Sequence, residues 1–327
     1  MRMRLLTRLF ILTAVAIACI AGGLGIIGYD IYRAGPLPEE TQIWIKKGQG
    51  LHSIAQEWSR DGIIAYPVTF KLVIFLKDIK IKAGEYNIPP RASIDTITRI
   101  LKNGKPILRK ITIPEGLSNN EIYEVLRSSP YMTGAIPEDF IFEGNLLPET
   151  YFFERGEERT ALLSRMAQGM EEKVKTLWNE RDPDLPLQNP TQLITLASIV
   201  EKETSRSSER ARIAGVFYNR LKKGMKLQTD PTIIYALTNG KGKLGRTLTR
   251  EDLAFDHLYN TYLHEGLPPG PIANPGEASL RAVVHPLTSK ELYFVADGTG
   301  GHAFAETLDA HNRNVAKWRK VQKDQIP

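Results

Sequence analysis

The stretch "LASIVEKETS", residues 196–205, places two carboxylates, Glu201 and Glu203, directly behind an apolar helical pattern. The longer segment "NPTQLITLASIVEKE" carries the signals of a helix start. Asn189 is a residue type that accepts a hydrogen bond at an N-cap, and Pro190 suits the first helical position because its missing N–H would be unpaired there. We therefore predict a helix over residues 190–203 that packs its apolar side into the core and carries acid groups at its end.

A helical wheel at about 100° per residue separates the two carboxylates. The buried arc is centred on four apolar residues and bounded by two isoleucines: Leu193, Leu196, Ala197, Val200, Ile194 and Ile199. Glu201 and Glu203 lie on opposite flanks of this arc. A carboxylate against apolar surface loses hydration, which favours the protonated form that a general acid needs. Ser198 and Ser205 make the Glu201 flank polar enough to line a cleft, so Glu201 is favoured as the catalytic residue.

The alternative is that both glutamates are boundary residues of the helix, paired with one of three neighbouring cations: Lys202, Arg206 or Arg210. Their opposite flanks also argue against a glycosidase built on this helix alone, because such enzymes hold two carboxyl groups about 5 to 9.5 Å apart. A second acid would have to come from elsewhere, with Asp230, Glu149 and Glu209 as candidates.

The first 35 residues predict a membrane anchor. Arginines precede an uncharged run over residues 9–29, which is long enough to cross a hydrocarbon core as one helix. No clean signal-peptidase site follows before Asp30. The positive-inside tendency puts the N-terminus in the cytoplasm and the catalytic part in the periplasm or outside, so we expect a single-pass protein of the cytoplasmic (inner) membrane. The lone cysteine, Cys19, lies within the run, so the outer part holds no disulfide.

The outer part predicts an α+β protein of two domains. Residues 36–110 read as a small membrane-proximal α+β domain, in which "KGQGLHSIAQEW" resembles the start of the LysM type of glycan-binding module; a plain spacer is the alternative. Residues 111–327 read as a larger, mainly helical catalytic domain with a hairpin around "GTGGHAF". The net charge of +6 names no partner by itself, and composition is that of an ordinary globular protein.

Several motifs that suggest other chemistry are set aside. "GKGKLGRT", residues 240–247, copies a phosphate-loop spacing but has Arg246 where lysine is required. The six histidines lack metal-ligand spacing, and no G-x-S-x-G serine signature is present. We therefore expect no cofactor, no metal and no nucleic acid.

Six linked motifs resemble one family. They are "EGNLLPETY", "LASIVEKET", "VFYNRLKKGMKLQTDPTIIYAL", "YNTYLHEGLPPGPIANPG", "HPLTSKELYFVADGTGGHAF" and "HNRNVAKW", in this order. Together they are similar to the endolytic murein transglycosylase family, the YceG-like proteins. The resemblance implies cleavage of the MurNAc–GlcNAc bond within peptidoglycan strands, leaving 1,6-anhydro-MurNAc ends, with Glu201 as single acid and base. It also implies trimming or termination of nascent strands and association with peptidoglycan synthases.

The walls of the cleft are expected from polar and aromatic residues of these motifs. Amide side chains can fix acetamido groups and tyrosine rings can stack on sugars. The expected substrate-binding residues are Gln228, Thr229, Asp230, Tyr259, Asn260, Tyr262, Glu149 and Ser198, with the backbone of residues 268–272. Glu203 is interpreted as structural or as an ion-pair partner. Two alternatives stay open: a hydrolase that uses water and a second carboxylate, and a non-catalytic LysM-type scaffold of the wall-synthesis machinery.

Overall fold

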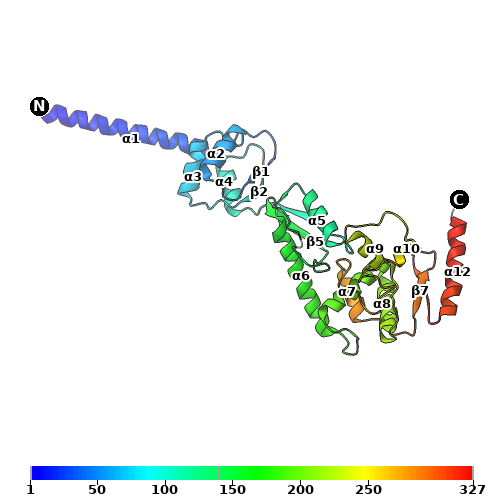
Figure 1. Ribbon diagram of the computed structural model, residues 1–327. Coiled ribbons are helices and arrows are strands. Elements are labelled where there is room, and N and C mark those ends of the chain that lie inside the picture. The colour runs from blue at the N-terminus through cyan, green and yellow to red at the C-terminus, as the bar shows by residue number, and fades with distance from the viewer. Residues whose placement is uncertain (1, 139, 326–327) are drawn as a thin grey trace. The chain divides into compact units, whose positions relative to one another are not determined.

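The computed structural model describes residues 2–138 and 140–325, which form a mixed α and β protein (Figure 1). The chain divides into two compact units. Unit 1 comprises the residues up to Arg109 together with Phe152–Gly156, and unit 2 comprises Lys110–Tyr151 and the chain from Glu157 onward. The boundary falls within two paired strands, β3 (Leu108–Thr112) and β5 (Thr150–Glu154).

Unit 1 follows the order helix, strand, helix, helix, strand, helix. Its elements are α1 (Arg2–Tyr32), β1 (Thr41–Ile45), α2 (Leu51–Arg60), α3 (Pro67–Leu76), β2 (Gly84–Ile88) and α4 (Ile94–Asn103). β1 and β2 pair antiparallel, with Trp44 opposite Glu85. In the sequence, Ile54, Ala55 and Trp58 fall at helical spacing, which predicts a helix. This helix is α2, and the three side chains are buried. The LysM resemblance of this unit stays a prediction.

Helix α1 contains one segment, Leu6–Tyr32, that is long and apolar enough to cross a membrane. The hydropathy window that defines this span is not buried within the protein. Water solvates an uncovered apolar helix of this length poorly. Such a helix is typical of a membrane span or of a signal sequence that is cleaved off.

Unit 2 surrounds a helical core. Its helices are α5 (Asn119–Ser128), α6 (Arg159–Glu180), α7 (Pro190–Glu203), α8 (Ser207–Lys222), α9 (Asp230–Thr238), α10 (Arg250–Leu253), α11 (Glu277–Val284) and α12 (Leu308–Gln325). The short strands β4 (Met132–Thr133) and β6 (Glu157–Glu158) pair in parallel. β7 (Tyr293–Ala296) and β8 (His302–Ala305) form the predicted antiparallel hairpin. The sequence "SNNE", residues 118–121, has the pattern of a capping box, which predicts a helix start there. The structure confirms it: Ser118 and Glu121 form a capping box at the start of α5.

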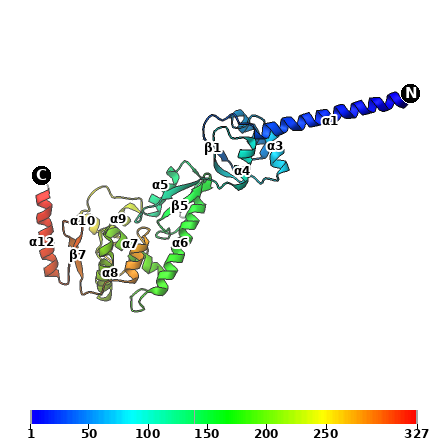
Figure 2. The same cartoon turned by 180° about the vertical axis from the view of Figure 1, so that it is seen from behind.

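Helix α7 is the centre of unit 2. It lies between α6 and α8 and also packs against α11 (Figures 1 and 2). The Asn189 side chain accepts the Gln192 N–H at 3.0 Å, which confirms the predicted helix start. Every residue over positions 193–200 is buried, including both presumed edges of the arc, Ile194 and Ile199. The wheel prediction of a single buried arc was too narrow, because three helices cover α7 rather than one surface.

Unit 1 contains a buried carboxylate that joins segments distant in sequence. Glu85 is 1% exposed and accepts hydrogen bonds from Arg109 at 2.7 Å and from Arg155 at 2.9 Å. The Arg155 guanidinium also lies over the Trp44 ring, 4.5 Å from its centroid. Since Arg155 belongs to the Phe152–Gly156 segment, this charge network holds that segment within unit 1.

We expect Glu85→Ala to lower the free energy of unfolding of unit 1 by about 2 kcal/mol, because it leaves two partly buried guanidinium groups facing each other. Arg60→Ala, which removes the exposed pair with Asp61, is the matched control and should change stability by less than about 1 kcal/mol. Denaturant unfolding monitored by tryptophan fluorescence measures both. Equal effects of the two substitutions would contradict the proposed weight of the Glu85 network.

Candidate active site

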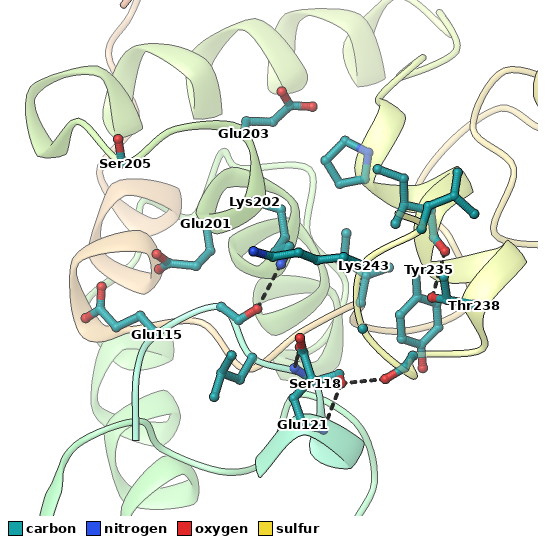
Figure 3. Close-up of a pocket in the computed structure, with 18 of the residues that line it drawn as sticks. Glu115, Ser118, Glu121, Glu201, Lys202, Glu203, Ser205, Tyr235, Thr238 and Lys243 are labelled. Carbon is teal, nitrogen blue, oxygen red and sulfur yellow. Dashed lines mark hydrogen bonds between the residues drawn. The ribbon is translucent and has the colours of Figure 1, made fainter. Parts of the chain in front are cut away.

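A pocket of about 680 Å³ opens on unit 2 at the end of α7. Its walls come from three segments far apart in sequence, residues 115–118, 201–205 and 240–246, together with one side of α9 (Figure 3). This volume lies in the range of sites that bury small ligands. Residues 193–200 of α7 are buried, and the last turn of the helix, which follows them, reaches the pocket.

Glu201 occupies the wall of this pocket with its side chain 6% exposed. One carboxylate oxygen accepts from Arg210 Nη2 at 3.0 Å, and the other accepts the backbone N–H of Gly276 at 3.1 Å. The sequence left open that Glu201 is a boundary residue of the helix that pairs with a cation such as Arg210. Glu201 does form this pair, and it also lies in the pocket wall.

Glu115 is a second carboxylate beside Glu201, and sequence reasoning missed it. Its Oε2 lies 3.4 Å from the same Arg210 nitrogen that binds Glu201, and Figure 3 shows the two glutamates turned toward each other. Burial, followed by the negative charge of Glu201, raises the pKa of Glu115 above its usual value. The only sign of Glu115 in the sequence is the segment "ITIPEG", in which an acid and a glycine follow a strand-like stretch. No spacing within the sequence relates this segment to the helix that carries Glu201.

Two glycines lie beside this pair of carboxylates. Gly116 adopts a φ of +77°, and a Cβ there would lie 3.4 Å from the Glu201 Cγ. At Gly276 a Cβ would lie 1.9 Å from the nearer carboxylate oxygen of Glu115. A side chain at Gly276 would displace Glu115, whereas at Gly116 the positive φ is what favours glycine.

Glu203 faces the other side of the helix end (Figure 3). It accepts a hydrogen bond from the hydroxyl of Thr229. Burial raises the pKa of Glu203 to about 7, because the loss of hydration outweighs the hydrogen bond from Thr229. This is a structural contact to the start of α9, in line with the interpretation from sequence, although the side chain also borders the pocket.

Lysines complete the pocket wall. Lys202 donates to the carbonyl of Gly116 at 3.0 Å, and Lys243 extends toward it from the opposite loop (Figure 3). That loop is the segment set aside as a phosphate-loop look-alike. Three of its glycines adopt positive φ, which lets the backbone curve along the pocket: Gly240, Gly242 and Gly245. The sequence excluded nucleotide binding for this loop but offered no sign that it borders the site.

Two of the expected substrate-binding residues are buried in supporting roles. Ser198 is 0% exposed, donates to the Thr195 carbonyl and accepts the Ile272 N–H at 3.0 Å. Asn260 is also 0% exposed and donates to the carbonyls of Leu253 and Phe255. Both hold loops in place and do not reach the pocket surface. The helix wheel could not show this for Ser198, because the loop that covers it comes from a distant part of the chain.

The other expected residues lie around the pocket rather than in its wall. Thr229 is buried and bonds Glu203, while Asp230 accepts the Tyr262 hydroxyl at 2.6 Å. Tyr259 packs against Tyr235, a wall residue, with ring centroids 4.9 Å apart. The remaining two, Gln228 and Glu149, are exposed; Glu149 adds negative charge near Glu115, which contributes to the raised pKa of Glu115.

Glu209, another candidate for a second acid, is engaged by the hairpin. It accepts the backbone N–H of His302 at 3.0 Å and lies 2.7 Å from its Nδ1. Burial alone would raise the pKa of Glu209, but the hydrogen bonds from His302 outweigh it and lower the pKa. Glu115, rather than Glu209 or Asp230, is the carboxylate that meets Glu201.

Comparison with known proteins identifies the family of this chain. The model of the YceG-like family matches residues 43–317, which include every residue of the pocket. The chain belongs to the YceG-like family. The protein named endolytic murein transglycosylase from Bacillus subtilis is 30% identical over 91% of both chains. A protein of the same name from Streptococcus pneumoniae is 27% identical over 94% of this chain, and this chain spans 65% of its length.

A solved structure shares this fold. The crystal structure of a putative YceG-like protein from Listeria monocytogenes is 29% identical, covers 84% of this chain and 98% of its own, and superposes with a TM-score of 0.54. The mixed α and β architecture is therefore that of a YceG-like protein.

We expect Gly276→Ala to leave the fold intact and move Glu115 away from Arg210, because the atoms that a methyl group meets belong to a flexible side-chain end. Gly215→Ala is the matched comparison: its Cβ would meet the Leu287 carbonyl oxygen at 2.3 Å, so it should destabilise unit 2 by more than about 1 kcal/mol. Denaturant unfolding and a crystal structure of the Gly276 variant check this. Equal destabilisation by Gly276→Ala and Gly215→Ala would show that the Glu115 side chain cannot move aside.

We expect the stability of unit 2 to fall as pH rises from about 4.5 to about 7. The folded state raises the pKa of Glu203 to about 7, as it does for the buried Glu143, so it binds protons that the unfolded chain has released. The stabilisation is complete at pH values below the pKa of these carboxyl groups in the unfolded chain. It is lost as the pH rises through their pKa in the folded protein. Glu203→Gln should flatten this dependence; thermal unfolding across this range measures it, and an unchanged slope would contradict the assignment.

Proposed function

We propose that this protein is an endolytic peptidoglycan lytic transglycosylase that uses Glu201 as its catalytic residue. Its substrate would be the MurNAc–GlcNAc bond within glycan strands. The observation that carries the proposal is the Glu201 carboxylate, enclosed at a helix end, held by Arg210 and the Gly276 N–H, and exposed to a pocket. Family membership and relatives named endolytic murein transglycosylase support it.

In the first step, protonated Glu201 donates its proton to the glycosidic oxygen as the bond to C1 of the muramic acid breaks. The GlcNAc chain leaves as an alcohol, and positive charge develops on the muramic ring. Glu201 becomes a carboxylate, and the guanidinium of Arg210 and the N–H of Gly276 are already placed to stabilise this new charge. These contacts are therefore suited to the product of proton transfer.

In the second step, the Glu201 carboxylate takes the proton from the C6 hydroxyl of the same muramic acid, whose oxygen closes on C1. The product is a 1,6-anhydro end, no water is consumed, and Glu201 returns to its protonated state. The nucleophile belongs to the substrate, so a single protein carboxylate completes the cycle.

The residues around the pocket provide a surface for sugars. Tyr235 is a wall residue, and Tyr259 supports it by ring packing. Aromatic rings stack on the apolar faces of sugars, and lysine ammonium groups donate to hydroxyl and carboxylate oxygens. Gln228, with Asp230 and Tyr262, lies at the start of α9 on the same side of unit 2 as the Pro231 wall. We include these three as contacts to more distant sugars of the strand.

Glu115 favours a second candidate, a hydrolase. A carboxylate beside Glu201 with a raised pKa meets the requirement for a second acid or base that activates water. In the lytic reaction the same group would instead add negative charge near the positively charged ring. The two reactions therefore differ in product chemistry and not in the residues present.

The anchor and the partners complete the proposal. Helix α1 would hold the protein in the cytoplasmic membrane with the N-terminus inside, so that the pocket acts on strands outside the cell. Cleavage there would trim or terminate nascent strands, beside peptidoglycan synthases. A LysM-type scaffold that binds glycan without cutting it is the third reading, and the enclosed Glu201 carboxylate in the pocket wall argues against it.

We expect wild-type full-length protein in detergent to release fragments with 1,6-anhydro ends from uncrosslinked glycan strands. Glu201→Gln should lower the rate by about 100-fold or more, since proton transfer is lost while the shape is kept. Mass spectrometry of products formed in water labelled with heavy oxygen is the measurement. The new 1,6-anhydro ends of lytic products contain no label, whereas hydrolysis puts one labelled oxygen on each new reducing end and none on the GlcNAc end.

Glu203→Gln is the matched control, because glutamine can still accept the Thr229 hydroxyl and should leave cleavage largely unchanged. Loss of activity in Glu203→Gln with activity retained in Glu201→Gln would exchange the two assignments. Labelled reducing ends that disappear in Glu115→Gln would establish the hydrolase. Binding of strands without cleavage by wild type would favour the scaffold.

A further inference from the structure

Helix α3 of unit 1 has an exposed apolar face. Val68 is 71% exposed, Phe75 is 79% exposed and Leu76 is 70% exposed, and Leu72 between them is half-buried. At about 100° per residue these four residues fall within one arc. The opposite side of the helix packs into the core through four residues: Thr69, Phe70, Val73 and Ile74. The helix is therefore apolar on both faces, and one of them has no protein cover among the described residues.

The other two core helices of unit 1 are different. α2 presents His52, Ser53 and Gln56 to solvent, and α4 presents Arg99 and Lys102. These are ordinary amphipathic helices with one apolar side. An apolar helix that leaves large side chains exposed is the pattern of a surface that meets another apolar phase. The solvent-facing sides of α2 and α4 are polar, whereas the exposed side of α3 is apolar and suits contact with another apolar surface.

The position of α3 indicates that occupant. Helix α1 packs against α3 and α4, and its Ile31 contacts the core of unit 1. The guanidinium of Arg33, just beyond the end of α1, lies 4.4 Å from the ring centroid of Tyr66, the N-cap residue of α3. In both Figure 1 and Figure 2, α3 lies at the end of unit 1 from which α1 extends. The exposed face is therefore next to the membrane segment.

The length of α1 sets the level of this face. At about 1.5 Å per residue, a hydrocarbon core of about 30 Å takes up about 20 residues of the span. The span Leu6–Tyr32 has 27 residues, so its last turns extend into the headgroup region. Tyr29 and Tyr32 are exposed there, which is typical of aromatic residues at a membrane interface. The contact between Arg33 and Tyr66 puts the start of α3 at the same level.

We propose that the exposed face of α3, formed by Val68, Leu72, Phe75 and Leu76, inserts into the interfacial region of the phospholipid bilayer that α1 spans. The inference rests on the proposed anchoring by α1 and adds a second attachment to it. A single spanning helix leaves the outer unit free to rotate about the helix axis. A second apolar contact beside the first removes this rotation and fixes which side of unit 1 faces the membrane.

The test uses site-specific fluorophores in the full-length protein, reconstituted at low density in phospholipid vesicles. Cys19 is the only cysteine, so Cys19→Ser gives a cysteine-free background. In it, Phe75→Cys places a label on the α3 face, and Lys105→Cys places one at an exposed position between α4 and β3 as the matched control. Wild type labelled at Cys19 reports the middle of α1. Quenching is compared for lipids with a nitroxide near the headgroup and near the end of the acyl chain.

We expect the label at position 75 to be quenched most by the shallow nitroxide, the label at Cys19 most by the deep one, and the label at position 105 by neither. A label at Val68→Cys should follow the one at 75 and lose its quenching when Phe75 and Leu76 are both changed to serine. Quenching at Cys19 with none at 68 or 75 would overturn the α3 contact while leaving the anchor intact. Absence of quenching at Cys19 would overturn both.

Self-quenching at position 75 that grows with protein density, without lipid quenching, would also overturn the proposal. It would show that a second copy of the chain covers the face.

Discussion

The enclosure of α7 is the constraint on which unit 2 depends. Residues 193–200 are buried on every side because α6, α8 and α11 pack around them, so the helix cannot rotate or slide without losing most of the core. The last turn of the helix follows this buried stretch and borders the pocket. Glu201 and Glu203 are therefore held at fixed positions by apolar packing several residues away, which is the rigid support that a catalytic carboxylate requires.

Charge sharing then sets the chemistry of the pocket. One guanidinium nitrogen of Arg210 contacts both Glu201 and Glu115, and a side chain at Gly276 would displace Glu115 from this arrangement. Burial drives the pKa of Glu115 upward, and the arginine limits that rise. Both carboxylates are present whether the reaction is lytic or hydrolytic, so the chemistry of the product distinguishes these two candidate reactions.

Unit 1 is organised by two different attachments. Glu85 holds the Phe152–Gly156 segment through Arg155, which keeps a strand from later in the sequence in this unit. Within the same unit, α1 packs against α3 and α4, and the apolar face of α3 lies beside the end of the span.

Local patterns in the sequence determined much of this protein. Asn189 and Pro190 predicted where α7 begins, Ser118 and Glu121 predicted the cap of α5, and the apolar run predicted a span, because caps and runs depend on neighbours in the chain. Glu201 was selected by its flank and by family motifs. Tertiary structure alone decided that Glu115 joins it, that Ser198 is buried under a distant loop, and that residues 240–246 border the pocket. These contacts link residues that lie far apart along the chain, and no periodicity within one segment records where another segment will pack.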